Sequence, residues 1–161
     1  NVELSGVISD MNNTDHFPCF LLISFQQTTK INHNSKMRNI LVIGAGRSCS
    51  SLIKYLLDKS DAENLSITIA DQSMQAAKKF TDGHANARAI LLDVFNEKDR
   101  RAAVENADLV ISMLPARFHI EAAKDCILYK KHLVTASYVS DEMQALDAEA
   151  KTNGLVFMNE I

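Results

Sequence analysis

The stretch that decides the fold runs from Asn39 to Leu57 and reads NILVIGAGRSCSSLIKYLL. The residues up to Ile43 form an apolar run typical of a buried strand, and leucine and isoleucine then recur at helical spacing. Between these two patterns lies Gly44-Ala45-Gly46, which predicts a tight turn. A strand, a glycine turn and the start of a helix form the setting in which such a turn binds a dinucleotide.

The alternation of strand and helix patterns continues along the chain. Apolar or β-branched runs predict strands at residues 39–43, 65–71, 87–94, 107–115, 132–137 and 155–158. Helical patterns lie between them, with Ser73, Asn96 and Ser140 as expected N-caps and Gly154 closing the last helix. Helices of this length between strands imply right-handed crossovers and a parallel sheet. We therefore expect an α/β fold, a doubly wound parallel sheet of Rossmann type with about six strands.

The glycine turn predicts a pyrophosphate site. Gly44 permits the tight turn, and Gly46 lets backbone N–H groups approach the phosphates. The following helix, expected to begin at Arg47, directs its positive end toward them. The third glycine of the dinucleotide fingerprint is replaced by Cys49, which is small enough for close packing of helix on strand. The alternative is a structural glycine turn in a domain that binds no dinucleotide.

Two carboxylates are expected at the ends of neighbouring strands. Asp71 ends the second expected strand, where a carboxylate accepts hydrogen bonds from ribose hydroxyls. Asp93 ends the third, beside the expected position of the adenine. No basic residue adjoins Asp71, and like charges about 4 Å apart repel by roughly 4 kcal/mol at an effective dielectric near 20. Because Arg47 offsets only part of this repulsion, we expect a preference for NAD over NADP, whose 2′-phosphate is an anion.

The composition indicates the class of protein and its partners. The chain has 161 residues, 47% of them hydrophobic, and a net charge of −3 without a lysine–arginine run, which argues against nucleic acid as the main partner. Cys19, Cys49 and Cys126 have no paired spacing, as in a reduced cytoplasmic protein. His16 and Cys19 are near each other, but structural zinc needs four ligands and no second pair follows, so we expect no metal.

Residues 1–36 differ from the rest of the chain. They are rich in Asn, Ser and Thr, and Met37 stands where a natural start would fall. Their apolar patch, residues 17–25, is shorter than the roughly 20 residues of a membrane span, and a signal peptide's positive charges do not precede it. We expect residues 1–36 to be an extension outside the fold and residues 37–161 to form the dinucleotide-binding domain. The alternative is a short arm that packs on the domain through residues 20–25.

Five segments of the sequence carry a resemblance to a known family. They read VIGAGR, DLVISMLP, FH, KKHLVTASYVS and GLVFMNEI, and they lie between Arg38 and Ile161. Together they resemble the N-terminal, NAD(P)-binding half of the saccharopine dehydrogenase family, notably its glutamate-forming saccharopine reductase branch. In that family a substrate and dimerisation domain follows, so we expect this dinucleotide-binding domain to be truncated at its C-terminal end and the substrate domain to be absent.

The resemblance also implies roles for individual residues. Those implied for the cofactor are Gly44, Gly46, Arg47 and Ser48 around the pyrophosphate, Asp71 at the ribose, and Leu114 and Pro115 beside the nicotinamide half. For the substrate, Ser137 and Tyr138 are implied to meet the amino acid. For Tyr138 the residues alone favour a half-buried loop aromatic. For His119 at a helix start we expect a surface or capping role, and for Asp108 a turn or cap role.

The function that the resemblance implies is oxidation of the secondary amine of saccharopine, a reaction of lysine metabolism, with a small amino-acid substrate, a cytoplasmic location and a homodimer formed through the absent domain. This chain would be the cofactor-binding portion of that oxidoreductase and inactive alone. The alternatives are a carboxynorspermidine dehydrogenase-like enzyme of the same fold and a nucleotide-sensing regulatory domain, which also uses a glycine turn and an acidic second strand end.

Overall fold

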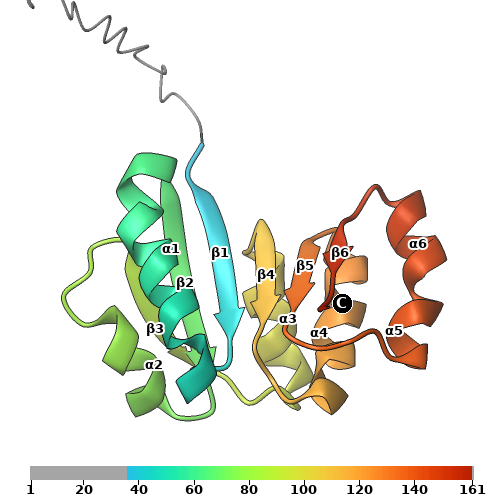
Figure 1. The fold of residues 1–161 in the computed structure, drawn as a ribbon, viewed down its shortest axis with the longest axis horizontal. Helices are drawn as coiled ribbons and strands as arrows, with labels where there is room; N and C mark the ends of the chain where they lie inside the picture. The colour runs from blue at the N-terminus through green and yellow to red at the C-terminus, as the bar shows by residue number, and fades with distance from the viewer. Residues whose placement is uncertain (1–35, 161) are drawn as a thin grey trace, which may run out of the picture. The chain divides into compact units, whose positions relative to one another are not determined.

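Six parallel strands form one sheet in the order β3-β2-β1-β4-β5-β6 (Figure 1). The computed structural model describes residues 36–160. The expected N-terminal extension, except Lys36, and the His16–Cys19 pair therefore lie outside the described residues. The strands are β1 (Arg38–Ile43), β2 (Leu65–Asp71), β3 (Ala87–Leu91), β4 (Leu109–Ser112), β5 (His132–Thr135) and β6 (Phe157–Met158). This order confirms the predicted doubly wound α/β fold.

Helices connect the strands and cover both faces of the sheet (Figure 1). They are η1 (Arg47–Cys49), α1 (Ser50–Glu63), α2 (Met74–Thr81), α3 (Glu97–Glu105), η2 (Ala116–Phe118), α4 (His119–Tyr129), α5 (Asp141–Ala145) and α6 (Asp147–Thr152). The helix expected from Arg47 thus begins with a short 3₁₀ turn before α1. The helix expected after Ser140 is divided at Leu146 into α5 and α6.

The central strand β1 separates two hydrophobic clusters. Ile40 and Val42 belong to the cluster that includes residues of α1 and α2. Leu41 and Ile43 belong to the opposite cluster, which includes residues of α3, α4 and α5. This alternation follows from the two-residue period of a strand, and it explains why β1 is apolar from Ile40 to Ile43: helices cover both faces of this part of the strand.

The expected caps are confirmed, and three of the strands end earlier than expected. Ser73, Asn96 and Ser140 each accept a backbone hydrogen bond from the third residue after them, at 3.2–3.3 Å. Gly154 follows α6 with φ +67°, as a helix-terminating glycine does. The strands expected to run to residues 94, 115 and 137 end at Leu91, Ser112 and Thr135. After the first two of these, the apolar residues beyond the strand line a cleft instead of continuing the ladder.

Within residues 36–160, none of the helices is long and apolar enough to cross a membrane. The same part of the chain contains no cluster of three or more His, Cys, Asp or Glu side chains that could hold a metal ion.

Candidate functional site

Gly44 sits where β1 ends and its backbone has φ +102°. Its N–H donates to the carbonyl of Ala70 at 2.8 Å, and the N–H of Met113 donates to the carbonyl of Ile43 at 2.8 Å. A Cβ at Gly44 would lie 3.0 Å from the backbone oxygen of Met113. Both the left-handed backbone and the close approach of the β4 end therefore require glycine at this position.

Gly46 lies in open space, whereas Gly44 is tightly packed. A Cβ built there would meet nothing within 4 Å, and the residue is exposed. No side chain caps η1 or α1, which follow directly. The backbone N–H groups at this helix start are thus open to an anion, and the helix dipole favours one there. The side chains of Arg47 and Ser48 are exposed beside this opening.

Cys49 lies behind the glycine turn, in the hydrophobic core. Its side chain is completely buried, and Sγ donates to the carbonyl of Gly46 at 2.8 Å. Burial is the main reason that the pKa of this thiol is raised, and the nearby Asp71 raises it further, against a backbone hydrogen bond that lowers it. The neutral thiol therefore packs α1 on the sheet and holds the turn from behind, without lining the cleft.

Asp71 ties the glycine turn to the end of β2. One carboxylate oxygen accepts the N–H of Ala45 at 2.7 Å, and the other accepts the N–H of Ser73 at 2.8 Å. The carboxylate thus stabilises two loops at once, the turn after β1 and the start of α2. It also lines the cleft, where the remaining lone pairs of both oxygens are available to a ligand.

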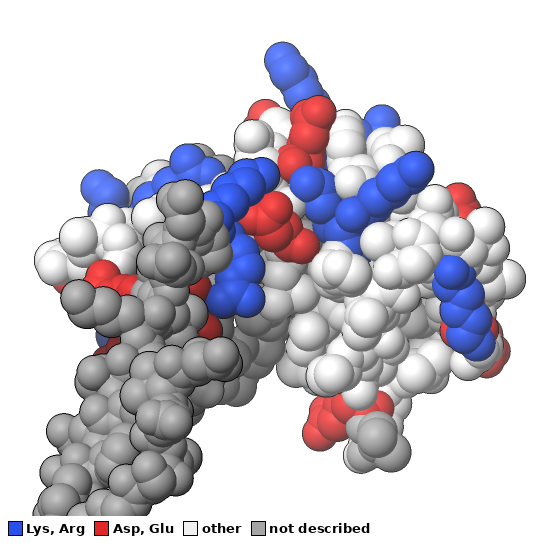
Figure 2. Space-filling model, turned by 90° about the horizontal axis from the view of Figure 1, so that it is seen from above, with Lys and Arg blue, Asp and Glu red and all other residues white. Residues whose placement is uncertain are grey.

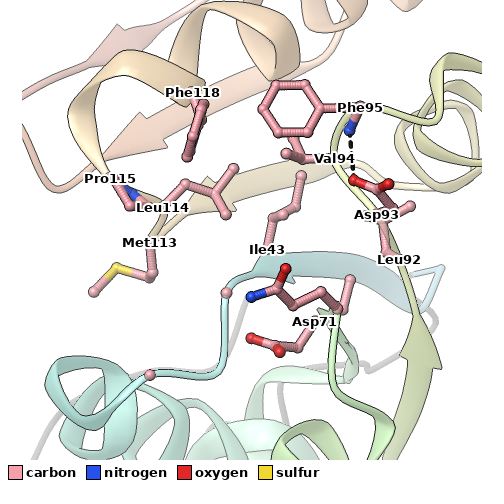
Figure 3. Close-up of a pocket in the computed structure, with 14 residues that line it drawn as sticks. Ile43, Asp71, Leu92, Asp93, Val94, Phe95, Met113, Leu114, Pro115 and Phe118 are labelled. Carbon is pink, nitrogen blue, oxygen red and sulfur yellow. Dashed lines mark hydrogen bonds between the residues drawn. The ribbon is translucent and has the colours of Figure 1, made fainter.

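A cleft of about 250 Å³ opens at the carboxyl ends of β1, β2, β3 and β4 (Figure 3). Its lining includes six of the predicted cofactor residues: Gly44, Gly46, Asp71, Asp93, Leu114 and Pro115. The other three, Arg47, Ser48 and Cys49, do not line it. The Asp93 carboxylate accepts the N–H of Phe95 at 3.0 Å and so shapes the loop after β3 (Figure 3).

Two aromatic side chains that the sequence analysis did not assign to the site close the wall of this cleft opposite the glycine turn. Phe95 and Phe118 pack edge to face, with ring centroids 5.0 Å apart. Phe95 is 64% exposed, and the guanidinium of Arg117 lies 4.6 Å from the centre of the Phe118 ring. The available signal was the position of Phe95, an aromatic residue that directly follows the expected strand end at Val94.

A second omission concerns the side chain of His119, for which the expected surface role is wrong, although the backbone N–H of this residue caps η2. The side chain is only 3% exposed. Its Nδ1 lies 2.8 Å from Oγ of Ser112, and its Nε2 lies 2.9 Å from Oγ of Ser137. Burial lowers the pKa of this imidazole. A helix start looks solvent-exposed in sequence, but α4 begins under the segment that follows β5, which covers the ring.

The two predicted substrate residues follow β5. Ser137 is half-buried and hydrogen-bonded to His119, whereas Tyr138 is 72% exposed and so does not adopt the alternative, a half-buried loop aromatic. Tyr138 and His119 line a separate pocket of about 110 Å³ that neighbours the η2 turn. Asp108 accepts the N–H of Asn39 at 2.7 Å and so joins the beginnings of β4 and β1, rather than forming the expected local turn or cap.

The position of the 250 Å³ cleft fits a dinucleotide. β1 pairs with β2 on one side and with β4 on the other, so the strand order reverses here. In open α/β sheets ligands bind at this point, outside the carboxyl ends of the strands.

On the face seen in Figure 2, acidic and basic side chains are intermingled rather than segregated by sign.

Comparison with known proteins gives a family and two kinds of relative. A family model described as "Saccharopine dehydrogenase NADP binding domain" matches residues 40–158. The chain is 37% identical over 124 residues to the saccharopine dehydrogenase [NADP(+), L-glutamate-forming] of Pyricularia oryzae. It is 32% identical over 144 residues to the alpha-aminoadipic semialdehyde synthase of Arabidopsis thaliana. A solved structure, the apo L-Glu-forming saccharopine dehydrogenase of Saccharomyces cerevisiae, is similar with a TM-score of 0.70 and 30% identity.

These relatives are much longer than the chain. The matches cover 77–79% of this chain, but only 27% of the Pyricularia and Saccharomyces proteins and 14% of the Arabidopsis protein.

The predicted preference for NAD is wrong. The matching family model is an NADP-binding domain, and the Pyricularia relative is named for NADP(+). The prediction treated the Asp71 carboxylate as a free anion directed at the ribose. In the structure both of its oxygens already accept backbone hydrogen bonds, from Ala45 and Ser73, which offset part of its negative charge. A repulsion calculated for an unpartnered carboxylate therefore overstates its effect on a 2′-phosphate.

Proposed function

Because the chain belongs to the saccharopine dehydrogenase family, through its NADP-binding domain, we propose that it is the cofactor-binding portion of an NADP-dependent enzyme that oxidises the secondary amine of saccharopine. The observation that carries the proposal is the glycine turn at the strand-order reversal, with Gly44 packed against the β4 end and Gly46 open above α1. The relatives at 30% identity or more are named for saccharopine or aminoadipic semialdehyde, which favours this substrate over carboxynorspermidine and over a purely sensory role.

The residues present fit a dinucleotide. The open N–H groups at Gly46 and the start of η1 would hold the pyrophosphate, with Arg47 and Ser48 as flanking polar groups. Asp71 would accept a ribose hydroxyl while it keeps the turn in place. Leu114 and Pro115, on the β4 side of the cleft, would border the nicotinamide half. When bound, NADP supplies the hydride acceptor, and the protein supplies position and electrostatics.

The amino-acid substrate would lie beside β4 and β5. Ser137 and Tyr138 follow the β5 end, next to the 110 Å³ pocket that Tyr138 lines. Ser137 is held by hydrogen bonds to its hydroxyl and its carbonyl, and the exposed Tyr138 ring is free to meet a substrate. In this arrangement the secondary amine would approach the nicotinamide from the side of the sheet that carries η2.

The test of cofactor binding is the Gly46→Val variant. Because the surroundings of Gly46 are empty to 4 Å and its φ is −71°, valine leaves the fold intact but fills the space above the helix start. We expect NADPH binding, measured by calorimetry, to fall at least tenfold while the melting temperature stays unchanged. Ala85→Val, in the exposed turn between α2 and β3, is the matched control and should bind as the wild type does. Equal NADPH affinity of Gly46→Val and wild type would refute the proposed site.

A further inference from the structure

Three side chains form a continuous hydrogen-bonded row next to the cleft. Ser112 ends β4, His119 begins α4, and Ser137 follows β5. The two serine hydroxyls lie 2.8 Å from Nδ1 and 2.9 Å from Nε2 of the imidazole. Ser112 is completely buried and His119 is 3% exposed, whereas Ser137 retains contact with solvent. The row therefore leads from the core of the protein to its surface.

The directions of these hydrogen bonds follow from burial. A hydroxyl hydrogen that is fully buried needs an acceptor. In the described part of the chain, the imidazole Nδ1 is the hydrogen-bond partner of the Ser112 hydroxyl, so Ser112 donates to Nδ1. The neutral ring then carries its hydrogen on Nε2 and donates it to Ser137. The lowered pKa of His119, caused by burial, agrees with a neutral ring, and no ion pair in residues 36–160 involves it.

Ser137 is thereby left with one hydrogen to donate. Its oxygen already accepts from His119, so its own O–H is directed away from the ring, toward the exposed side. Its backbone is fixed as well, because its carbonyl accepts the N–H of Glu160 at 3.0 Å. A serine held in this way has a single orientation in which it can bind a ligand.

We propose that His119 is a positioning residue that fixes Ser137 as a hydrogen-bond donor to a carboxylate oxygen of the amino-acid substrate. The proposal rests on the proposed function for the identity of that substrate. An anionic acceptor is favoured because hydrogen bonds to a charged oxygen are the stronger ones. The neighbouring pocket is also lined by Arg117 and Glu142, whose charges suit the carboxylate and the ammonium group of an amino acid.

The first experiment needs no ligand. In the full chain labelled with ¹⁵N-histidine, we expect the two ring nitrogens of His119 at neutral pH to show a neutral imidazole protonated on Nε2. The signals are assigned by their loss in His119→Gln. A ring protonated on Nδ1, or a charged ring, would overturn the proposal without bearing on whether the chain binds NADP.

The second experiment separates the two hydrogen bonds of the imidazole. In a side-chain amide, the nitrogen of Gln reaches the position of Nε2 and donates as Nε2 does, whereas the oxygen of Asn reaches the position of Nδ1 and accepts as Nδ1 does. His119→Gln thus keeps the contact with Ser137, and His119→Asn keeps only that with Ser112. The probe is saccharopine, titrated into the NADPH-saturated full chain and followed by the amide NMR signals of Ser137 and Tyr138.

We expect His119→Gln to bind saccharopine within about threefold of the wild type. His119→Asn and Ser137→Ala should bind about tenfold more weakly, the size expected for one hydrogen bond to a charged group. NADPH affinity should be equal in all four proteins. Equal saccharopine affinity of His119→Asn and wild type, or no saccharopine shifts at Ser137 in the wild type, would overturn the proposal. If the wild type does not bind NADPH, that result would instead refute the proposed function.

Discussion

Gly44 shows how a single backbone conformation determines the candidate site. At φ +102° and with the Met113 carbonyl 3.0 Å from where its Cβ would be, this residue sets the path of the chain from β1 into the turn. Gly46 does not need the conformational freedom of glycine, because its φ of −71° suits any residue. Two glycines in one turn thus have different physical roles: the first is required by the fold and the second by space for a ligand.

Replacing Gly44 by alanine should therefore destabilise the protein. A strained backbone at a non-glycine residue costs about 1–3 kcal/mol, and the close contact with the β4 backbone adds to it. We expect the melting temperature of Gly44→Ala to fall by about 5 °C or more, measured by circular dichroism. Gly46→Ala is the control and should melt within about 1 °C of the wild type. Equal melting temperatures of the two variants would contradict the assignment of strain to Gly44.

His119 should make stability depend on pH in the mildly acidic range. Its pKa in the folded protein is lowered by burial below the usual 6.5, so the unfolded chain binds a proton first as the pH falls. The contribution of the neutral ring to stability is complete above about pH 6.5 and decreases as the pH falls toward the folded pKa. Urea unfolding at pH 7.5 and pH 5.5 measures the free energy of unfolding. Between these two pH values, this free energy should decrease more for the wild type than for His119→Gln. Equal losses would mean that other groups cause the acid sensitivity.

At the scale of elements, a buried ion pair joins α3 to α4. The Arg100 guanidinium donates to the Asp125 carboxylate at 2.6 Å, and both side chains are at most 5% exposed. Arg101 reaches the second oxygen of Asp125 at 3.2 Å, and this hydrogen bond is the main cause of the raised pKa of Arg101. Arg100 also donates to the carbonyl of Val94, which lines the cleft. The packing of two helices thus supports the cleft wall that follows β3.

Removing one member of this pair should lower the free energy of unfolding. Arg100→Met leaves the Asp125 charge buried with only Arg101 beside it, and breaking a buried pair in this way costs about 3 kcal/mol or more. The double variant Arg100→Met, Asp125→Leu should recover most of that loss, because no uncompensated buried charge remains. Chemical denaturation of the three proteins measures both effects. A double variant as unstable as the single one would show that the stability is lost with the Arg100 contact to Val94 rather than with the ion pair.

The elements and the glycine turn could be predicted because their signals are local. Hydrophobic periodicity gave all six strands, and Ser73, Asn96 and Ser140 gave the caps. The contacts of His119 could not be predicted, because its partners come from the ends of two different strands and only the tertiary fold brings them to one ring. The same holds for the hydrogen bonds of Asp71 to two loops, and their omission led to the wrong cofactor preference.

At the scale of the whole molecule, the proposed cofactor residues and the proposed substrate residues lie at one edge of the sheet, and the proposed substrate side is open. Tyr138 is 72% exposed, and Val139 beside it is 50% exposed. The chain matches only about a quarter of the Pyricularia relative. Catalysis of a two-substrate reaction depends on holding the reactants in one orientation, which contributes several kcal/mol to lowering the barrier.

We therefore predict that the 161-residue chain binds NADPH but does not oxidise saccharopine at a measurable rate. The open substrate side leaves the amine free to adopt many orientations. The measurement is NADPH formation from NADP and saccharopine, followed by absorbance, with calorimetric NADPH binding as the control for folded protein. Turnover at the rate of a complete dehydrogenase would show that the chain carries all the groups that the reaction needs.

The position of β1 in the sheet has a consequence for how the protein folds as it is synthesised. β1 is the first strand of the described chain but lies in the centre, and Ile40 pairs with Leu109 only after β2, α2, β3 and α3 have been made. One edge of this strand, which is apolar from Ile40 to Ile43, therefore remains without its partner while the chain from β2 to β4 is translated. Unpaired apolar edges of nascent chains are where aggregation begins, and long-range parallel pairing is slow because a long loop must close first. The yield of folded protein in a cell should thus depend on translation speed and chaperones more than its final stability suggests.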